Sequence, residues 1–142
     1  MPHQIYPCLW FTKEAAEAAA FYCSIFPNSS ILNQSPMVVN FELNGKHFMA
    51  LNDKGPKHPF NEAVSFVIPC DNQEEIDYYW NKLTADGGKE SMCGWCADKF
   101  GISWQVIPSI LGELMSQPGK AQKVVQAFLK MKKFDIETLK NA

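Results

Sequence analysis

The chain has 142 residues, which is enough for a single domain with a sizeable core. Its 13 basic residues are all lysine, and 15 acidic residues leave a net charge of −2. Arginine is the preferred residue for two-pronged contacts to phosphate and guanine, so its absence argues against nucleic-acid binding. The same absence lowers the expectation of a tightly bound polyphosphate cofactor.

The N-terminal residues 1–7 contain neither a basic region nor an apolar run, so no signal peptide is expected. No apolar stretch in the sequence approaches the roughly 20 residues of a membrane span. Five cysteines at irregular spacing fit reduced thiols better than a disulfide framework. We therefore expect a cytoplasmic protein that has neither a membrane nor a nucleic acid as a partner.

The first part of the chain predicts a strand, a helix and a hairpin. Residues 5–11 form the expected strand, and Thr12 is the expected N-cap of the helix that follows. Residues 38–43 alternate between apolar and polar and predict a half-buried strand. Asn44-Gly45 predicts a tight turn that connects it to a returning strand at 47–52. The apolar face of the helix is formed at helical spacing by Ala18, Phe21, Tyr22 and Ile25.

The same pattern returns about 58 residues later. A strand is predicted at 63–68, and Asp71 with Glu74 predicts a capping box at the start of a second helix. Strands are predicted again at 89–96 and at 102–107. The apolar face of the second helix has the spacing of the first and consists of Ile76, Tyr79, Trp80 and Leu83.

The elements located in each half are one strand, a helix and two further strands. We interpret the repeat as strand–helix–strand–strand–strand, occurring twice, which indicates a duplicated supersecondary unit rather than a solenoid. The remaining residues are expected to be helical, with Pro118 just inside the start of an amphipathic segment. Residues 118–142 hold six lysines and two acidic residues. We interpret this segment as a helix packed by its apolar face with its lysines in water.

These residues resemble the vicinal-oxygen-chelate superfamily, which includes glyoxalase I, bleomycin-resistance proteins and extradiol dioxygenases. Residues 98–105 are similar to the D-x-x-G-x-x-x-E end of that family's second module, with Gln105 in place of the glutamate. The closer resemblance is to the PhnB-like branch, named the 3-demethylubiquinone-9 3-methyltransferase family. It is carried by residues 7–11, 19–22, 26–27, 44–45, 93–95, 98–108 and 131–136.

The resemblance implies an α+β fold in which two βαβββ modules form a curled mixed sheet around a cavity, followed by C-terminal helices. We expect residues 1–142 to form a single glyoxalase-like domain, with module one at about 1–58 and module two at about 59–110. A helical extension is expected at about 111–142. The resemblance also implies a homodimer.

Metal-dependent members of the superfamily bind iron, zinc, nickel or manganese through His and Glu on inward strand faces. The corresponding positions here fall on Gln105, about Ala63, Ile5 and about Ala50. One neutral amide and three aliphatic side chains cannot build a divalent-metal site. His47 is expected to point to the opposite face of its strand from Ala50. We therefore expect neither a metal nor any other cofactor.

The methyltransferase name of the family finds no support in the residues that usually bind S-adenosylmethionine. The first strand runs into its helix through residues 12–15 without a glycine, and no G-x-G-x-x-G is present. Cys93 and Cys96 form a C-x-x-C between strands. The interpretation we favour is a packed turn, while a thiol that faces the cavity and a redox or metal role stay open.

Strand parity predicts which side chains face the cavity. The expected cavity is mostly apolar with a few neutral polar groups, a lining that suits an uncharged or aromatic ligand. The residues expected to contact the ligand are Phe48, Asn52, Ser65, Trp95, Ser103 and Gln105.

No nucleophile–base pair and no catalytic carboxylate pair is visible in the sequence. The function expected is thus that of a metal-free small-molecule-binding protein. The alternative is an enzyme that acts on a quinone-like or phosphonate-like substrate, either a methyltransferase or a lyase or isomerase of the glyoxalase type. The sequence leaves open whether the protein is an enzyme.

Overall fold

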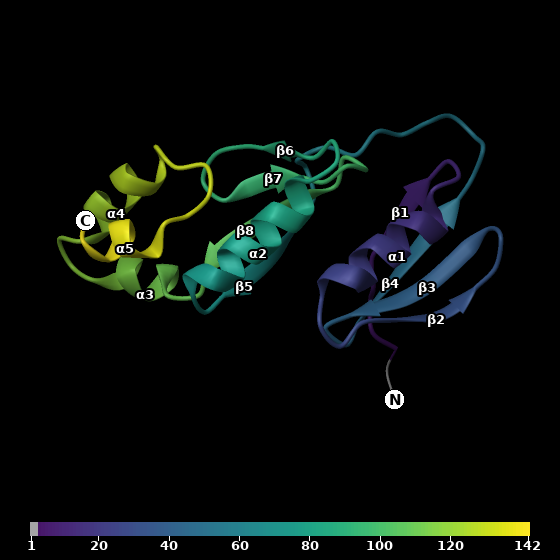
Figure 1. Cartoon of the computed structure of the whole chain (residues 1–142), viewed down its shortest axis with the longest axis horizontal. Coiled ribbons are helices and arrows are strands. Elements are labelled where there is room, and N and C mark those ends of the chain that lie inside the picture. The colour runs from purple at the N-terminus through teal and green to yellow at the C-terminus, as the bar shows by residue number, and fades with distance from the viewer. Residues whose placement is uncertain (1–2) are drawn as a thin grey trace. The chain divides into compact units, whose positions relative to one another are not determined.

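The computed structural model describes residues 3–142 (Figure 1). Residues 1 and 2, which belong to the segment in which no signal peptide is expected, lie outside the described residues. The chain divides into two compact units, Met1–Pro59 and Phe60–Ala142. Among residues 3–142, none of the helices combines the length and the hydrophobicity that a membrane span requires.

The first unit is a four-stranded mixed sheet with one helix. Strand order in the sheet is β1-β4-β3-β2, with β1 parallel to β4 and the other pairs antiparallel. Its elements are β1 (Cys8–Phe11), α1 (Ala15–Ile25), β2 (Ser30–Gln34), β3 (Val38–Leu43) and β4 (Lys46–Asn52).

Helix α1 lies against one face of this sheet, mainly over β3 and β4 (Figure 1). The core between them contains a row of rings in which Tyr22 lies 6.3 Å from Phe41, and Phe41 lies 5.6 Å from Phe48. Val39 and Ala50 complete this buried face. The alternation of β3 predicted from the sequence is confirmed, because every second residue of this strand is buried under α1.

The expected N-cap of α1 is wrong. Helix α1 begins after Glu14, whose side chain makes no capping hydrogen bond. Instead the backbone N–H of Ala15 donates to Oδ1 of Asn52 at 2.9 Å, and Nδ2 of Asn52 donates to the carbonyl of Pro36 at 3.1 Å. An orphan N–H at the helix start is thus satisfied by a side chain 37 residues away in sequence.

The second unit repeats the first. Strand order is β5-β8-β7-β6, with β5 parallel to β8. Its elements are β5 (Ser65–Cys70), α2 (Gln73–Thr84), β6 (Lys89–Glu90), β7 (Trp95–Ala97) and β8 (Ser103–Pro108). The predicted α+β fold with two βαβββ modules is confirmed as two open four-stranded mixed sheets, each with its own helix.

Two local predictions in the second unit need correction. The predicted strand at 89–96 is two strands, because Cys93 and Gly94 both adopt a left-handed backbone conformation that ends β6 pairing and starts a turn. The N-cap of α2 lies one residue later than expected. Asn72 Oδ1 accepts from the N–H of Glu75 at 2.9 Å, in place of a capping box at Asp71 and Glu74.

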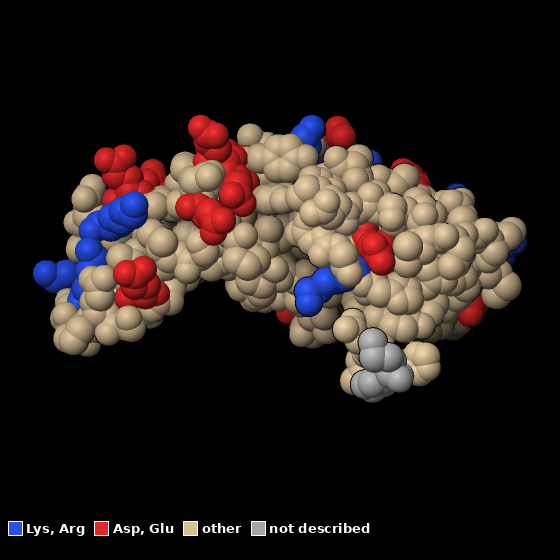
Figure 2. Space-filling model, turned by 90° about the horizontal axis from the view of Figure 1, so that it is seen from below, with Lys and Arg blue, Asp and Glu red and all other residues tan. Residues whose placement is uncertain are grey.

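The chain then continues into three short helices, α3 (Leu111–Ser116), α4 (Ala121–Phe128) and α5 (Ile136–Lys140). On the face shown in Figure 2, lysine and carboxylate side chains lie next to one another over these helices. On this face the C-terminal segment therefore presents charges of both signs rather than a patch of one sign. This agrees with the interpretation of its lysines as solvent-exposed side chains.

The segment between α4 and α5 packs against the turn before β7. The N–H groups of Cys93 and Gly94 each donate at 2.8 Å, to the carbonyls of Met131 and Lys132 respectively. The ring of Phe134 is almost fully buried against Gly94, where a Cβ atom would lie 2.5 Å from Cε2 of the ring. Gly94 is therefore required both by its backbone conformation and by the close approach of Phe134.

Helix α2 also holds this segment. The Gln73 side chain donates from Nε2 to the carbonyl of Phe134 and accepts from the N–H of Ile136, both at 2.9 Å. Lys133 and Asp77 form an ion pair at 2.7 Å. The segments 93–95 and 131–136, both of which carry the family resemblance, are thus parts of one packed structure.

Candidate functional site

Four of the six predicted ligand contacts lie on one face of the second sheet. Ser65 pairs with Ser103 across β5 and β8, and Trp95 pairs with Gln105 across β7 and β8. Nε2 of Gln105 donates to Oγ of Ser65 at 2.9 Å. Helix α2 packs against the opposite face, so this face of the sheet is not covered by its own helix.

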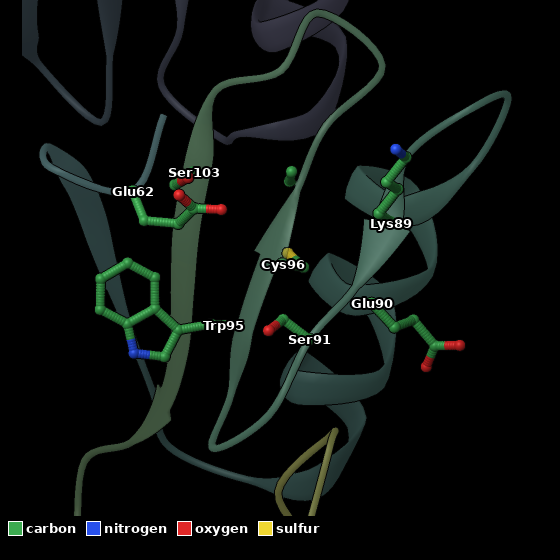
Figure 3. Close-up of a pocket in the computed structure, with 8 residues that line it drawn as sticks. Glu62, Lys89, Glu90, Ser91, Trp95, Cys96 and Ser103 are labelled. Carbon is green, nitrogen blue, oxygen red and sulfur yellow. The ribbon is translucent and has the colours of Figure 1, made fainter. Parts of the chain in front are cut away.

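A pocket of about 350 Å³ opens beside Trp95 and Ser103 (Figure 3). In this view the Trp95 indole and the Glu62 side chain extend on one side of the pocket, and Lys89 and Glu90 lie on the other. The pocket is lined by Glu62, Lys89, Glu90, Ser91, Trp95, Cys96, Ala97 and Ser103.

Its charged residues were not expected from the sequence. Glu62 lies in the loop before β5, while Lys89 and Glu90 form the short edge strand. The alternation of side chains along a strand therefore did not predict that these residues line the pocket. Nε1 of Trp80 donates to Oε1 of Glu90 at 2.7 Å, which ties that carboxylate to α2. The lining of this pocket therefore combines three charged side chains with the neutral residues around Trp95 and Ser103. Ser65 and Gln105 lie on the same face of the sheet but are not part of this lining.

The two cysteines of the C-x-x-C differ in environment. Cys96 is 2 % exposed, and burial raises the pKa of its thiol to about 12, with smaller contributions from the nearby carboxylates of Asp98 and Glu90. A thiol with this pKa stays protonated at neutral pH and is a poor nucleophile or metal ligand. Cys93 occupies the left-handed turn held by Met131. This arrangement favours the packed-turn interpretation.

Asp98 organises the turn that leads into β8. Its Oδ1 accepts from the N–H groups of Phe100 at 2.8 Å and Ile102 at 3.2 Å, and its Oδ2 accepts from Nε1 of Trp104 at 2.8 Å. Gly101 completes the turn with a φ of 91°. The aspartate and glycine of the motif at 98–105 thus fix the strand that presents Ser103 and Gln105.

Phe48 and Asn52 lie elsewhere, in the first unit. Phe48 is buried and stacks on Phe41 under α1, and Asn52 bonds to the first turn of α1. Both side chains, like Ala50, therefore face α1 and not the uncovered face of their sheet. The sequence grouped these residues on one face correctly, but it did not reveal that α1 covers this face. Their contact with a ligand stays a prediction.

A metal site does not fit the residues present. Of the four positions where the superfamily resemblance implies metal ligands, Gln105 bonds to Ser65 and Ala50 is buried under α1. Ile5 and Ala63 lie before β1 and β5, outside the strands. Within residues 3–142 no three His, Cys, Asp or Glu side chains lie close enough together to hold a metal ion. This donor set offers no charged ligand for a divalent cation.

Comparison with known proteins places the chain in a family. Residues 3–107 match the family model described as 3-demethylubiquinone-9 3-methyltransferase. A PhnB protein from Bacillus cereus is 29% identical, with a TM-score of 0.68 over 75% of this chain and 99% of the other. No curated protein matches the chain.

Two more distant structures share the fold. The fosfomycin resistance protein FosX from Listeria monocytogenes is 16% identical, with a TM-score of 0.57 over 82% of this chain and 99% of the other. A glyoxalase-related enzyme from Fulvimarina pelagi is 16% identical, with a TM-score of 0.51 over 72% of this chain and 86% of the other. At these identities the likeness extends to the fold and not to activity.

Proposed function

The chain belongs to the 3-demethylubiquinone-9 3-methyltransferase family, the PhnB-like branch of the vicinal-oxygen-chelate superfamily, and from that membership we propose that it binds a small neutral or aromatic organic molecule without a metal. The observation that carries this proposal is the partly exposed indole of Trp95, which lines the pocket together with the neutral hydroxyl residues Ser91 and Ser103. Together they line a pocket large enough for a single substituted ring.

The chemistry of the lining supports an aromatic ligand. An indole offers a large flat surface, and an offset stack with another ring adds about 1 kcal/mol to the burial of its area. Ser91 and Ser103 offer neutral donors and acceptors that orient a ring through its substituents, and the Gln105–Ser65 pair extends this polar face of the sheet next to Trp95. Glu62 and Lys89 are exposed residues of the lining, so water screens their charge.

The test uses 2,3,4,5-tetramethoxytoluene, a methylated quinol ring that cannot alkylate the cysteines of the chain. Titration calorimetry with the full chain is expected to show saturable binding, and Trp95→Ala is expected to weaken it about tenfold. Tyr78→Ala is the matched control, because Tyr78 is an exposed aromatic residue on α2, away from the pocket lining. Absence of binding, or equal binding by Trp95→Ala, would refute the proposed site.

A second candidate function is methyl transfer, which the family description favours. The join between β1 and α1, where many S-adenosylmethionine enzymes carry a glycine loop, contains Thr12, Lys13 and Glu14. We expect no saturable binding of S-adenosylmethionine in a calorimetric titration. Binding in the micromolar range would contradict the proposed binding function and favour a methyltransferase. A lyase or isomerase on a quinone-like or phosphonate-like substrate is the other enzymatic alternative.

The proposed partner is a second copy of the chain, and the proposed location is the cytoplasm. Native mass spectrometry of the freshly purified protein tests the oligomeric state and the metal content in one spectrum. We expect the mass of a dimer without a bound ion. A monomer mass would contradict the homodimer, and a stoichiometric ion would contradict the metal-free proposal.

A further inference from the structure

A second polar cluster lies on the uncovered face of the first sheet. Nε2 of His47 on β4 lies 2.8 Å from Oδ1 of Asn40 on β3, and Nδ2 of Asn40 donates to Oδ1 of Asn33 on β2 at 2.9 Å. The three side chains form one hydrogen-bonded row across three neighbouring strands. His47 was expected to point away from Ala50, and because Ala50 lies under α1, His47 lies on the open face.

This row assigns the proton on the imidazole. Since Nδ2 of Asn40 donates to Asn33, the amide oxygen of Asn40 faces His47 and can only accept. His47 must then donate from Nε2, so the neutral ring carries its lone pair on Nδ1. Nδ1 makes no hydrogen bond with any residue in the described range 3–142, and the side chain of His47 is partly exposed.

The surroundings of His47 favour a flat ligand. The Tyr6 ring stacks on the imidazole at a centroid distance of 3.9 Å and an interplanar angle of 24°. Glu42 is the direct cross-strand partner of His47, so its carboxylate is on the same face of the sheet.

We propose that His47 is a proton acceptor for a small planar molecule with a weakly acidic hydroxyl group, such as a phenol or an enol. In this step the O–H bond of the ligand breaks and an N–H bond forms at Nδ1. The ligand remains as an oxyanion next to the imidazolium, and nothing is oxidised or reduced. The row through Asn40 and Asn33 positions the ring, and Tyr6 supplies an aromatic surface.

His58 provides the matched control in the same unit. It lies in the exposed loop after β4, with its ring tilted at 58° against Trp10 and 4.6 Å away. No amide side chain in residues 3–142 bonds to its ring nitrogens, so its tautomer is not assigned by a hydrogen bond. Both histidines thus contact an aromatic ring, and only His47 is oriented as an acceptor.

The binding test uses 4-nitrophenol, whose ionised form absorbs visible light. With the full chain we expect saturable binding and a rise of phenolate absorbance at a pH where the unbound phenol is largely protonated. His47→Gln still donates to Asn40 but has no basic nitrogen, and it is expected to weaken binding at least about tenfold. His58→Gln is expected to bind within about twofold of the wild type. Equal binding by the two variants would overturn the proposal.

Nitrogen NMR of the histidine rings tests the positioning role. The wild type is expected to show Nε2 of neutral His47 as the protonated nitrogen, and Asn40→Ala is expected to yield a mixture of tautomers and about threefold weaker nitrophenol binding. A proton on Nδ1 of the neutral wild-type ring would overturn the proposal. Tetramethoxytoluene has no O–H group, so its binding at Trp95 succeeds or fails independently of His47.

Discussion

The two units share one topology but hold it with different polar groups. The strand orders β1-β4-β3-β2 and β5-β8-β7-β6 are equivalent, and in both sheets the first strand runs parallel to the last. The first unit closes its final hairpin with two residues, Asn44-Gly45, and caps α1 from a distant strand. The second uses a turn around the buried Asp98 and a local cap on α2.

Their edges and additions also differ. Outer strand β2 has five residues, all exposed and uncharged, whereas β6 has only two, both charged. A short charged edge resists pairing with another chain, and a longer neutral edge does not. Within the second unit, the C-terminal segment packs against Gly94, Gln73 and Asp77. A duplicated backbone can therefore be stabilised by polar contacts that are not duplicated.

The largest difference between the units is expected at their left-handed glycines. A Cβ atom on Gly94 would lie 2.5 Å from the buried Phe134 ring and 2.8 Å from the carbonyl of Val106, whereas nothing lies within 4 Å of a Cβ atom on Gly45. Gly94→Ala should lower the free energy of unfolding by about 3 kcal/mol, through strain and overpacking together. Gly45→Ala should cost about 1 kcal/mol from its backbone conformation alone.

Urea denaturation followed by tryptophan fluorescence measures both variants. If Gly94→Ala costs no more than Gly45→Ala, the C-terminal segment does not constrain the turn before β7, and the proposed dependence of the second unit on this segment fails.

The next effect concerns the buried turn of the second unit. Asp98→Asn replaces one oxygen by an NH₂ group that would face an N–H donor from the backbone or from Trp104. We expect a loss of about 2 kcal/mol in unfolding free energy. Asp53→Asn is the counterpart in the first unit, where an exposed carboxylate accepts one bond from Gly55, and it should cost less than about 0.5 kcal/mol. Equal urea midpoints for the two variants would contradict this contrast.

Helix capping sharpens the comparison further. Asn52→Ala removes the acceptor for Ala15 and the donor to Pro36, so it should cost about 1.5 kcal/mol. Asn72→Ala removes only the local cap of α2, with an expected cost of about 1 kcal/mol. Thermal or urea unfolding of the two variants ranks them. A larger cost for Asn72→Ala would show that the distant cap is the less important of the two.

The helices and strands were largely predictable because apolar spacing is a local property. The buried faces of α1 and α2 contain Tyr22, Ile25, Ile76 and Leu83 as predicted. The face of β4 was not predictable, because a period of two residues fixes which residues share a face but not which face the helix covers. His47 does lie on the opposite face from Ala50, as predicted, and this is the open face because Ala50 and Asn52 lie toward α1.

The candidate site was predictable only where a strand continues through it. Ser65, Ser103 and Gln105 share one face because β5 and β8 are regular and paired along their length. Glu62 lies in a loop and Lys89 in an edge strand of two residues. Such segments have no regular alternation of side chains, so the sequence does not predict which way these residues point. The distant cap by Asn52 was equally hidden, since it needs the tertiary contact between β4 and α1.

The smallest expected effect depends on pH and belongs to the second unit alone. The Lys133 ammonium, and then the Gln73 amide, hold the pKa of Asp77 below its usual value. A folded-state pKa below the unfolded value stabilises the fold at pH values above the unfolded pKa of about 3.9, and this contribution disappears as the pH falls through the lower folded pKa. Because both side chains are more than a third exposed, the contribution is below about 1 kcal/mol.

Amide hydrogen exchange resolves such a small effect better than global unfolding does. In Asp77→Asn the N–H of Gly94, which donates to Lys132, should exchange about twofold faster near neutral pH, because the C-terminal segment detaches more often. The N–H of Met49 in the first unit, which donates to Pro7, should not change. The wild type and the variant should converge at Gly94 once the pH is well below about 3.9. Equal acceleration at Met49 would mean that the ion pair supports the whole chain, and the contrast between the two units would then not extend to their electrostatics.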